Sequence, residues 1–151
     1  MRYLLALLPL FFASTLTANA QTIKPLIDSQ NYVFIAQIAQ PLGTESRNLT
    51  YGTYNLKITK SKIVCSLPYY GRSRVASDPG TNPLEFTSNK FKYTVTPHKD
   101  GWKVSIKPRD AGDLDLLEIY VYPEGNANVQ ATFNGRDPIG FTGTVIAPTN
   151  P

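Results

Sequence analysis

Alternating apolar and polar residues mark strands along most of the chain. Residues 53–60, 91–96 and 102–107 each place apolar side chains at every second position, with mainly polar residues between them. Successive side chains of an extended chain point to opposite faces, so this period of two predicts strands with one buried face. Residues 116–122 are apolar on both faces apart from Glu118, which predicts a central strand.

Turn signals join these strands into hairpins. Residues 98–101 carry Gly101, which is available for a positive φ, and residues 123–126 and 134–137 are similar glycine-containing turns. A short helix is expected only at residues 25–29, where a proline suits the first turn. Shorter apolar segments predict the remaining strands, at residues 32–39, 63–67, 84–87, 128–133 and 139–146.

Antiparallel strands joined by short turns predict a mainly β protein with at most one short N-terminal helix. Each hairpin has a polar face, so the antiparallel sheet is expected to bend over a single core, as a sandwich or half-open barrel. A register slip of one residue would expose every core side chain, so the strand phases predict which residues share the core. These are Trp102, Val104, Ile106, Leu117, Ile119, Val129, Ala131 and Phe133.

Residues 1–20 have the layout of a secretory signal peptide. An arginine supplies the positive end, residues 3–17 are uncharged and mainly apolar, and the small residues Ala18 and Ala20 stand at the two positions that signal peptidase reads. We therefore predict cleavage after Ala20, a single β domain over residues 21–151, and a soluble periplasmic or secreted location. The apolar run is too short for a stable membrane anchor, since a spanning helix needs about 20 residues.

Composition limits the chemistry that the chain can perform. Hydrophobic residues make up 42% and charged residues 17% of the 151, which is typical of a folded domain. One cysteine and one histidine exclude an internal disulfide framework, a cysteine-rich zinc site and a multi-histidine metal site. The formal net charge of +4 is modest, and export disfavours nucleic acid as a partner. We therefore expect no cofactor, no metal and no nucleic acid.

The reactive side chains favour structural roles over catalysis. Cys65 has the phase of the buried residues of its strand, so we expect an inert thiol. His98 lies in a turn, with no group nearby in sequence to orient it as a general base. Asp110, Asp113 and Asp115 cluster around a glycine, but their spacing does not match a calcium-binding loop. We assign no catalytic residue.

The most unusual stretch is LPYYGRS at residues 67–73. It opens a loop of about 15 residues, a length that is often functional. Tyrosine and arginine dominate binding hot spots, so Tyr69, Tyr70, Arg72 and Arg74 are the candidate binding residues. Alternation predicts that one ring packs inward together with Arg72, while the other faces outward with Arg74. Alternatively, the loop is only architectural, with both rings sealing the sheet edge and Arg72 stacked on one of them.

The same stretch resembles the signature of a known family. LPYYGR at residues 67–72 is similar to the Leu-Pro-Tyr-Phe/Tyr-Gly-Arg motif of domain-of-unknown-function family 4251, exported envelope proteins of Bacteroidota. Residues 28–32 resemble its opening, and residues 75–79 depart from the Ala-Pro-Tyr-like stretch that members often carry. The resemblance implies an exported, mainly β domain and no activity. Its closing hairpin matches at residues 125–129, Arg136, Ile139, Phe141 and Gly143.

These features favour a non-enzymatic binding module whose partner is an envelope protein or glycan. The alternatives are a hydrolase acting on envelope polymers and a structural subunit of a surface assembly. Two carboxyl groups about 5–10 Å apart across a cleft would favour the hydrolase. A surface patch of tyrosine and arginine would favour binding, and an exposed, unpaired apolar edge strand would favour assembly.

Overall fold

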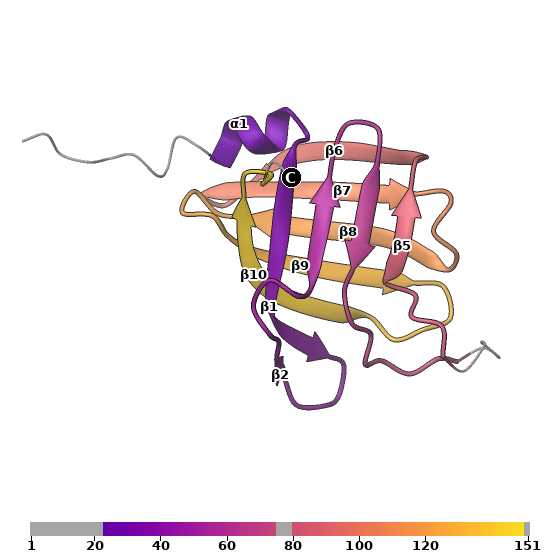
Figure 1. Cartoon of the computed structure of the whole chain (residues 1–151). Helices are drawn as coiled ribbons and strands as arrows, with labels where there is room; N and C mark the ends of the chain where they lie inside the picture. Colours follow the sequence, from indigo (N-terminus) through magenta and orange to yellow (C-terminus); the bar gives the residue numbers. More distant parts are fainter. Residues whose placement is uncertain (1–22, 75–79, 150–151) are drawn as a thin grey trace, which may run out of the picture.

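The computed structural model describes residues 23–74 and 80–149, which form one short helix and one antiparallel sheet (Figure 1). The predicted signal peptide lies outside these residues. No helix within them is long and apolar enough to cross a membrane. The elements are α1 (Ile23–Asp28), β1 (Tyr32–Pro41), β2 (Arg47–Asn48), β3 (Asn55–Ile58), β4 (Ile63–Ser66), β5 (Glu85–Ser88), β6 (Phe91–His98), β7 (Gly101–Pro108), β8 (Leu114–Val121), β9 (Asn126–Phe133) and β10 (Ile139–Ile146).

The strands follow one another around a half-open barrel. Their order is β5-β4-β3-β1-β10-β9-β8-β7-β6, and β2 pairs only with β1. The first strand therefore lies beside the last, with Val33 opposite Ile146 and Pro41 opposite Ile139. In Figure 1, β3, β4 and β5 stand in front of β6 to β9, and β1 and β10 connect the two layers. This confirms the predicted mainly β class and the half-open barrel.

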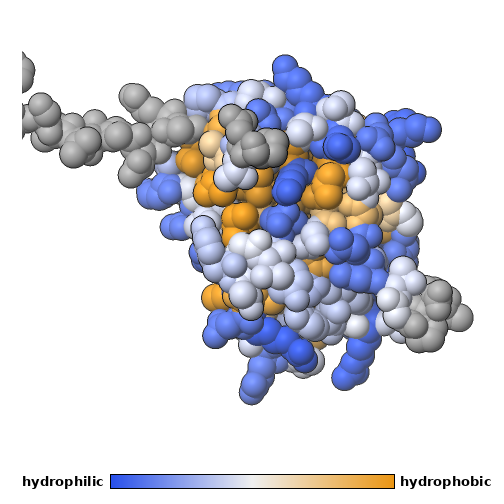
Figure 2. All heavy atoms as spheres, viewed as in Figure 1, coloured by the Kyte–Doolittle hydropathy of each residue, from blue (hydrophilic) through white to orange (hydrophobic). Residues whose placement is uncertain are grey.

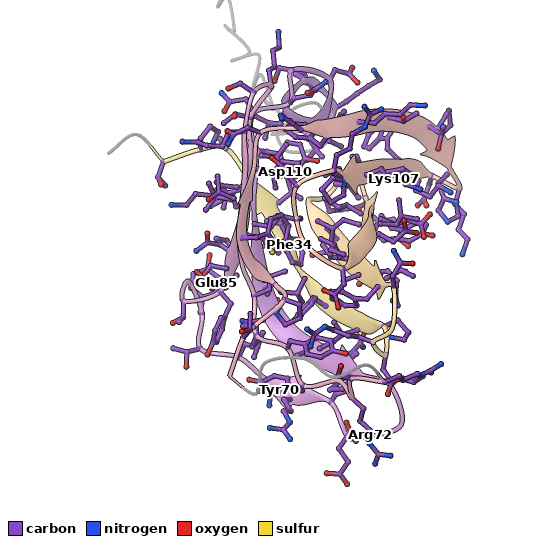
Figure 3. The ribbon with its side chains drawn as sticks, turned by 90° about the vertical axis from the view of Figure 1, so that its right-hand side faces the viewer. Phe34, Tyr70, Arg72, Glu85, Lys107 and Asp110 are labelled. Carbon is purple, nitrogen blue, oxygen red and sulfur yellow. The ribbon has the colours of Figure 1, made fainter. Side chains whose placement is uncertain are left out.

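The core fills the space between the two layers, and Phe34 points into it (Figure 3). All of the predicted core residues are buried except Trp102, which is only partly buried and packs against the core. Trp102 is the second residue of β7, directly after the turn that joins β6 to β7. From the outside, hydrophobic residues are visible mainly across the middle of the face, with hydrophilic side chains around them (Figure 2).

Helix α1 lies over one end of the barrel. It buries Ile23 and Ile27 against the core, and Tyr93 of β6 donates a hydrogen bond of 2.9 Å to the carbonyl oxygen of Ile27. The hydroxyls of Tyr93 and Tyr32 are 3.1 Å apart, which links β6 to β1 across the interior. Burial raises the pKa of Tyr93 to about 12 and holds the pKa of Tyr32 well above its usual value.

The open seam lies between β5 and β6, which are joined by a short turn but do not pair with each other. Asp110, in the turn after β7, holds this corner. Its carboxylate accepts hydrogen bonds from the hydroxyl of Ser88 and, at 3.0 Å, from the backbone N–H of Asn89. The Ser88 hydrogen bond is the main cause that lowers the Asp110 pKa. Asp110 therefore stabilises the corner.

Two local features differ from the sequence prediction. The positive φ of the β6–β7 turn is at Lys99 (53°), and Gly101 serves a close approach instead, because a Cβ there would lie 2.2 Å from the carbonyl oxygen of Val121. A bulge between Ala36 and Ile38 shifts the register of β1 against β10. The bulge reverses which residues of β1 face outward, so Gln40 is exposed on the outer face.

Candidate functional site

The LPYYGRS stretch crosses the end of the barrel opposite α1. The turns before β3, after β4 and before β10 all reach this end, because β1 pairs with β3 and β10 and β3 pairs with β4. Asn82 fixes both sides of the loop. It donates to the carbonyl oxygen of Leu67 at 2.8 Å and accepts from the N–H of Leu84 at 2.9 Å. Leu67 and Leu84 are fully buried, so the loop starts and ends on the core.

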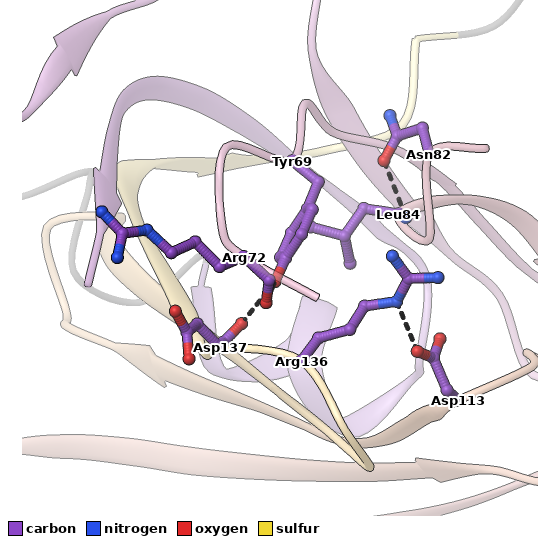
Figure 4. Close-up of polar contacts among 7 residues, drawn as sticks. All are labelled: Tyr69, Arg72, Asn82, Leu84, Asp113, Arg136 and Asp137. Atoms are coloured by element: carbon purple, nitrogen blue, oxygen red, sulfur yellow. Dashed lines mark hydrogen bonds and ion pairs between the residues drawn. The ribbon is translucent and has the colours of Figure 1, made fainter. Parts of the chain in front are cut away.

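Tyr69 anchors the loop to the turn between β9 and β10 (Figure 4). Its ring packs edge-on against Phe133 with centroids 5.2 Å apart, and its hydroxyl donates 2.8 Å to the carbonyl oxygen of Asp137. Gly71 makes room for this ring, since a Cβ there would lie 2.2 Å from the Tyr69 hydroxyl. Burial, followed by the nearby Asp137 charge, raises the pKa of Tyr69. Tyr69 is an architectural residue.

Tyr70 takes a different environment. The guanidinium of Arg47, from β2, lies 4.4 Å from the centroid of the Tyr70 ring. The two neighbouring tyrosines thus contact different partners, although both rings are partly buried against the core. Sequence reasoning missed β2 and Arg47, because a strand of two exposed polar residues carries no hydrophobic period. Figure 3 shows Tyr70 and Arg72 together at this end of the molecule.

Neither loop arginine has the role that alternation predicts, although Arg74 is exposed as expected. Arg74 is fixed: its Nη2 lies 2.9 Å from Oδ1 of Asp137, and its N–H donates 2.7 Å to the carbonyl oxygen of Gly135. Arg72 does not stack on Tyr69. Its side chain is exposed, and it has no ion-pair partner within the described ranges. The guanidinium 5.9 Å from the Tyr69 centroid belongs to Arg136, which also pairs with Asp113.

The contacts of the two arginines have a physical cause. The loop runs alongside the β9–β10 turn, where Ser73 bridges to Arg136 and the N–H of Asp137 donates 2.9 Å to the carbonyl oxygen of Arg72. Arg74, two residues after Arg72, therefore meets the Asp137 carboxylate, and the Arg72 side chain does not. We call this region the arginine end, formed by Arg47, Arg72, Arg74 and Arg136 with Tyr69 and Tyr70. Two of its arginines are paired with carboxylates, Arg74 with Asp137 and Arg136 with Asp113, and Glu45 lies nearby in the β1–β2 turn.

A second feature, which sequence reasoning missed, is a hollow of about 440 Å³ on the outer face of β1, β8, β9 and β10. Gly140 forms part of its floor. The polar side chains around it come from alternate positions of four strands, so in the sequence they look like an ordinary solvated face. Only the strand register brings them together. They are Gln40, Tyr120, Tyr122, Asn128, Gln130 and Thr142.

The remaining reactive groups do not form a catalytic arrangement among the described residues, and only His98 contacts a residue of the hollow. Cys65 is buried, as its strand phase predicts, and burial raises the pKa of its thiol. His98 packs edge-on against Tyr120, with centroids 4.9 Å apart. Asp115 pairs with Lys107 at 3.3 Å, far from forming a cluster with Asp110. Within residues 23–74 and 80–149, no three histidine, cysteine or carboxylate side chains converge as metal ligands.

Comparisons with known proteins agree on one family. The model of a domain of unknown function, DUF4251, matches residues 15–145. Among solved structures, the chain is similar to the crystal structure of a DUF4251 family protein from Bacteroides eggerthii DSM 20697, with a TM-score of 0.59 and 12% sequence identity. The similarity covers 85% of this chain and 87% of the other, and at this identity it shows a shared fold. No curated protein matches.

Proposed function

This chain belongs to the DUF4251 family of domains of unknown function, and from the geometry of its own surface we propose that it is a non-enzymatic binding module of the cell envelope. The arginine end is its binding surface, and its partner is an acidic envelope protein or glycan. One observation carries the proposal. A segment rich in tyrosine and arginine is held rigidly by the Tyr69 and Arg74 contacts to the β9–β10 turn, while Arg72 is left exposed.

Rigid presentation of cations favours binding. Arg47 is exposed but stacked on Tyr70, so less of its side-chain freedom is lost when a ligand binds. Arg74 is paired with Asp137 and still has 71% of its side chain exposed. A guanidinium can donate two parallel hydrogen bonds to a carboxylate or phosphate, which makes arginine suited to acidic ligands.

The two alternative functions find less support. A hydrolase needs a pair of free carboxyl groups across a cleft. At the arginine end, Asp113 and Asp137 are each engaged by an arginine. A surface assembly through strand addition needs an apolar edge strand. The edge strand β5 exposes Glu85 and Thr87, and the edge strand β6 exposes Lys92 and threonines, so both edges are polar.

The experiment neutralises charge at this end of the barrel. The double variant Arg47→Gln/Arg72→Gln is compared with Lys60→Gln/Lys62→Gln, which makes the same change of charge in the β3–β4 turn at the opposite end. Each protein is tested for retention on immobilised heparin and polygalacturonate, and for co-purification from its native envelope. We expect the arginine variant to bind about tenfold more weakly, with an unchanged melting temperature, while the lysine variant binds normally.

Equal binding by the two variants would contradict the proposal, because the attraction would then be a property of net charge alone. Raised salt should weaken the interaction, since exposed charges are screened. The envelope location rests on residues 1–20. It is tested by N-terminal sequencing of the exported protein, which should begin at Gln21. Retention of the first residues in the exported protein would contradict it.

A further inference from the structure

The hollow around Gly140 is separate from the arginine end and has a different chemistry. Gln40, Gly140 and Gln130 stand side by side on β1, β10 and β9, in register. In the next outward-facing row, Thr142 lies opposite Asn128. Asn128 in turn lies opposite Tyr120 of β8. The hollow is therefore lined by two neighbouring rows of mainly polar side chains on the outer face of the sheet.

Glycine makes this hollow possible. A Cβ at position 140 would meet Oε1 of Gln130 at 3.2 Å and Oε1 of Gln40 at 3.5 Å, so both amide groups lean over the glycine. The φ of Gly140 lies outside the left-handed region, so the backbone itself would accept another residue. Glycine at this position is therefore not required by the backbone conformation; its missing side chain leaves the space of the hollow.

The polar groups of the hollow are not used by the protein. Within the described part of the chain, none of the side chains of Gln40, Tyr120, Asn128, Gln130 and Thr142 has a hydrogen-bond partner, and the same is true of Tyr122. The hydroxyls of the architectural tyrosines, in contrast, are all bonded internally: those of Tyr32, Tyr69 and Tyr93. Hydroxyl and amide groups thus converge on the hollow while remaining available to a ligand.

The hollow is also electrically neutral. None of its lining residues is charged. The nearest charged residues in the register are Glu118, opposite Gln130, and Lys103, opposite Tyr120. These two lie 3.4 Å apart in an ion pair, so they neutralise each other at the rim. Neither an anionic nor a cationic ligand would gain much here, which separates this surface from the arginine end.

We propose that the Gly140 hollow binds a neutral saccharide, which goes beyond the function proposed for the arginine end. Sugar hydroxyls both donate and accept hydrogen bonds, as do the amide and hydroxyl side chains of the lining. The C–H faces of a sugar ring pack on aromatic rings, and two tyrosines flank the hollow. His98 packs against the edge of Tyr120 and holds that ring in place. Most of the site is thus formed before the ligand arrives.

The first test fills the hollow with a side chain. In Gly140→Val, a β-branched side chain occupies the floor of the site, and such residues suit strands. Thr132→Val is the matched control, because Thr132 is an exposed position of β9 outside the hollow. Titration calorimetry is run on the whole protein with neutral hexasaccharides of glucose, mannose and N-acetylglucosamine, at millimolar concentrations. We expect at least one to bind, and Gly140→Val to weaken that binding at least tenfold, with Thr132→Val unaffected.

A second variant removes chemistry instead of adding bulk. Gln130→Ala keeps the hollow open but deletes one amide, and it should weaken the same saccharide several-fold even if Gly140→Val folds poorly. Binding that is unchanged in both variants would overturn the proposal, and so would a complete lack of binding across the panel. Binding of polygalacturonate that is lost in Gly140→Val, with no neutral sugar bound, would also overturn it, because the site would then select charge.

Discussion

At the scale of single residues, Tyr69 and Tyr70 show how adjacent, identical side chains acquire different roles. The Tyr69 hydroxyl satisfies the Asp137 carbonyl, whereas the Tyr70 ring carries the Arg47 guanidinium on its face and needs no hydroxyl for that contact. Tyr69→Phe should lower the free energy of unfolding by about 1 kcal/mol, the usual value of one such hydrogen bond. Tyr70→Phe should leave it unchanged. Urea unfolding of both variants measures the difference, and equal losses would mean that Tyr69 is not the anchor.

Residue-level prediction from sequence succeeded where burial follows the strand period. Cys65 and Val104 are buried because their phase on a strand leaves no other place for them. It failed for Arg72 and Arg74, because their positions depend on Asp137, which lies more than 60 residues further along the chain. Local alternation carries no information about a partner that distant.

At the scale of elements, the hairpins were predictable because alternation and turn residues agree in β6 to β10. The outer hollow was not predictable. Each strand contributes polar residues that, within that strand alone, resemble an ordinary solvent-exposed face. Only the pairings of Gly140 with Gln130 and with Gln40 bring two glutamines to one glycine. The bulge in β1 determines that pairing. No sequence signal around Ala36 predicts the bulge.

The corner between β5 and β6 depends on one carboxylate. Hydrogen bonds from Ser88 and Asn89 lower the pKa of Asp110, so the folded state favours its charged form. A lowered pKa stabilises the fold above the unfolded-state pKa, and this contribution is lost as pH falls through the folded-state value. Asp110→Ala should therefore be less stable than the parent at neutral pH, with the gap closing below pH of about 4. Thermal melts across this range measure it; a constant gap would contradict the assignment.

At the scale of the whole molecule, the pair of Tyr32 and Tyr93 joins the helix, β6 and β1. Unfolded tyrosines ionise near pH of about 10. Burial raises the pKa of Tyr93 to about 12, so between these values the unfolded chain binds fewer protons than the folded one. Stability should therefore be retained below pH of about 10 and fall as the pH rises towards the folded-state pKa.

The control for this alkaline effect is Tyr93→Phe. It removes the titrating phenol and the hydrogen bond to Ile27, so it should be about 1 kcal/mol less stable at neutral pH but lose less with each pH unit above 10. Chemical denaturation at a series of pH values gives both quantities. If the slopes of the two proteins coincide, ionisation of Tyr93 does not drive the alkaline loss.

The pairing of β1 with β10 also determines when the protein can fold. Val33 pairs with Ile146, near the end of the chain, so the barrel cannot close until the last strand is present. Contacts between such distant parts of a chain form slowly, because a long loop must close first. In a chain that crosses a membrane from its N-terminus, β1 would therefore emerge long before the strand that pairs with it. Under the proposed export, the order of strands in the sheet delays closure of the barrel until β10 has crossed.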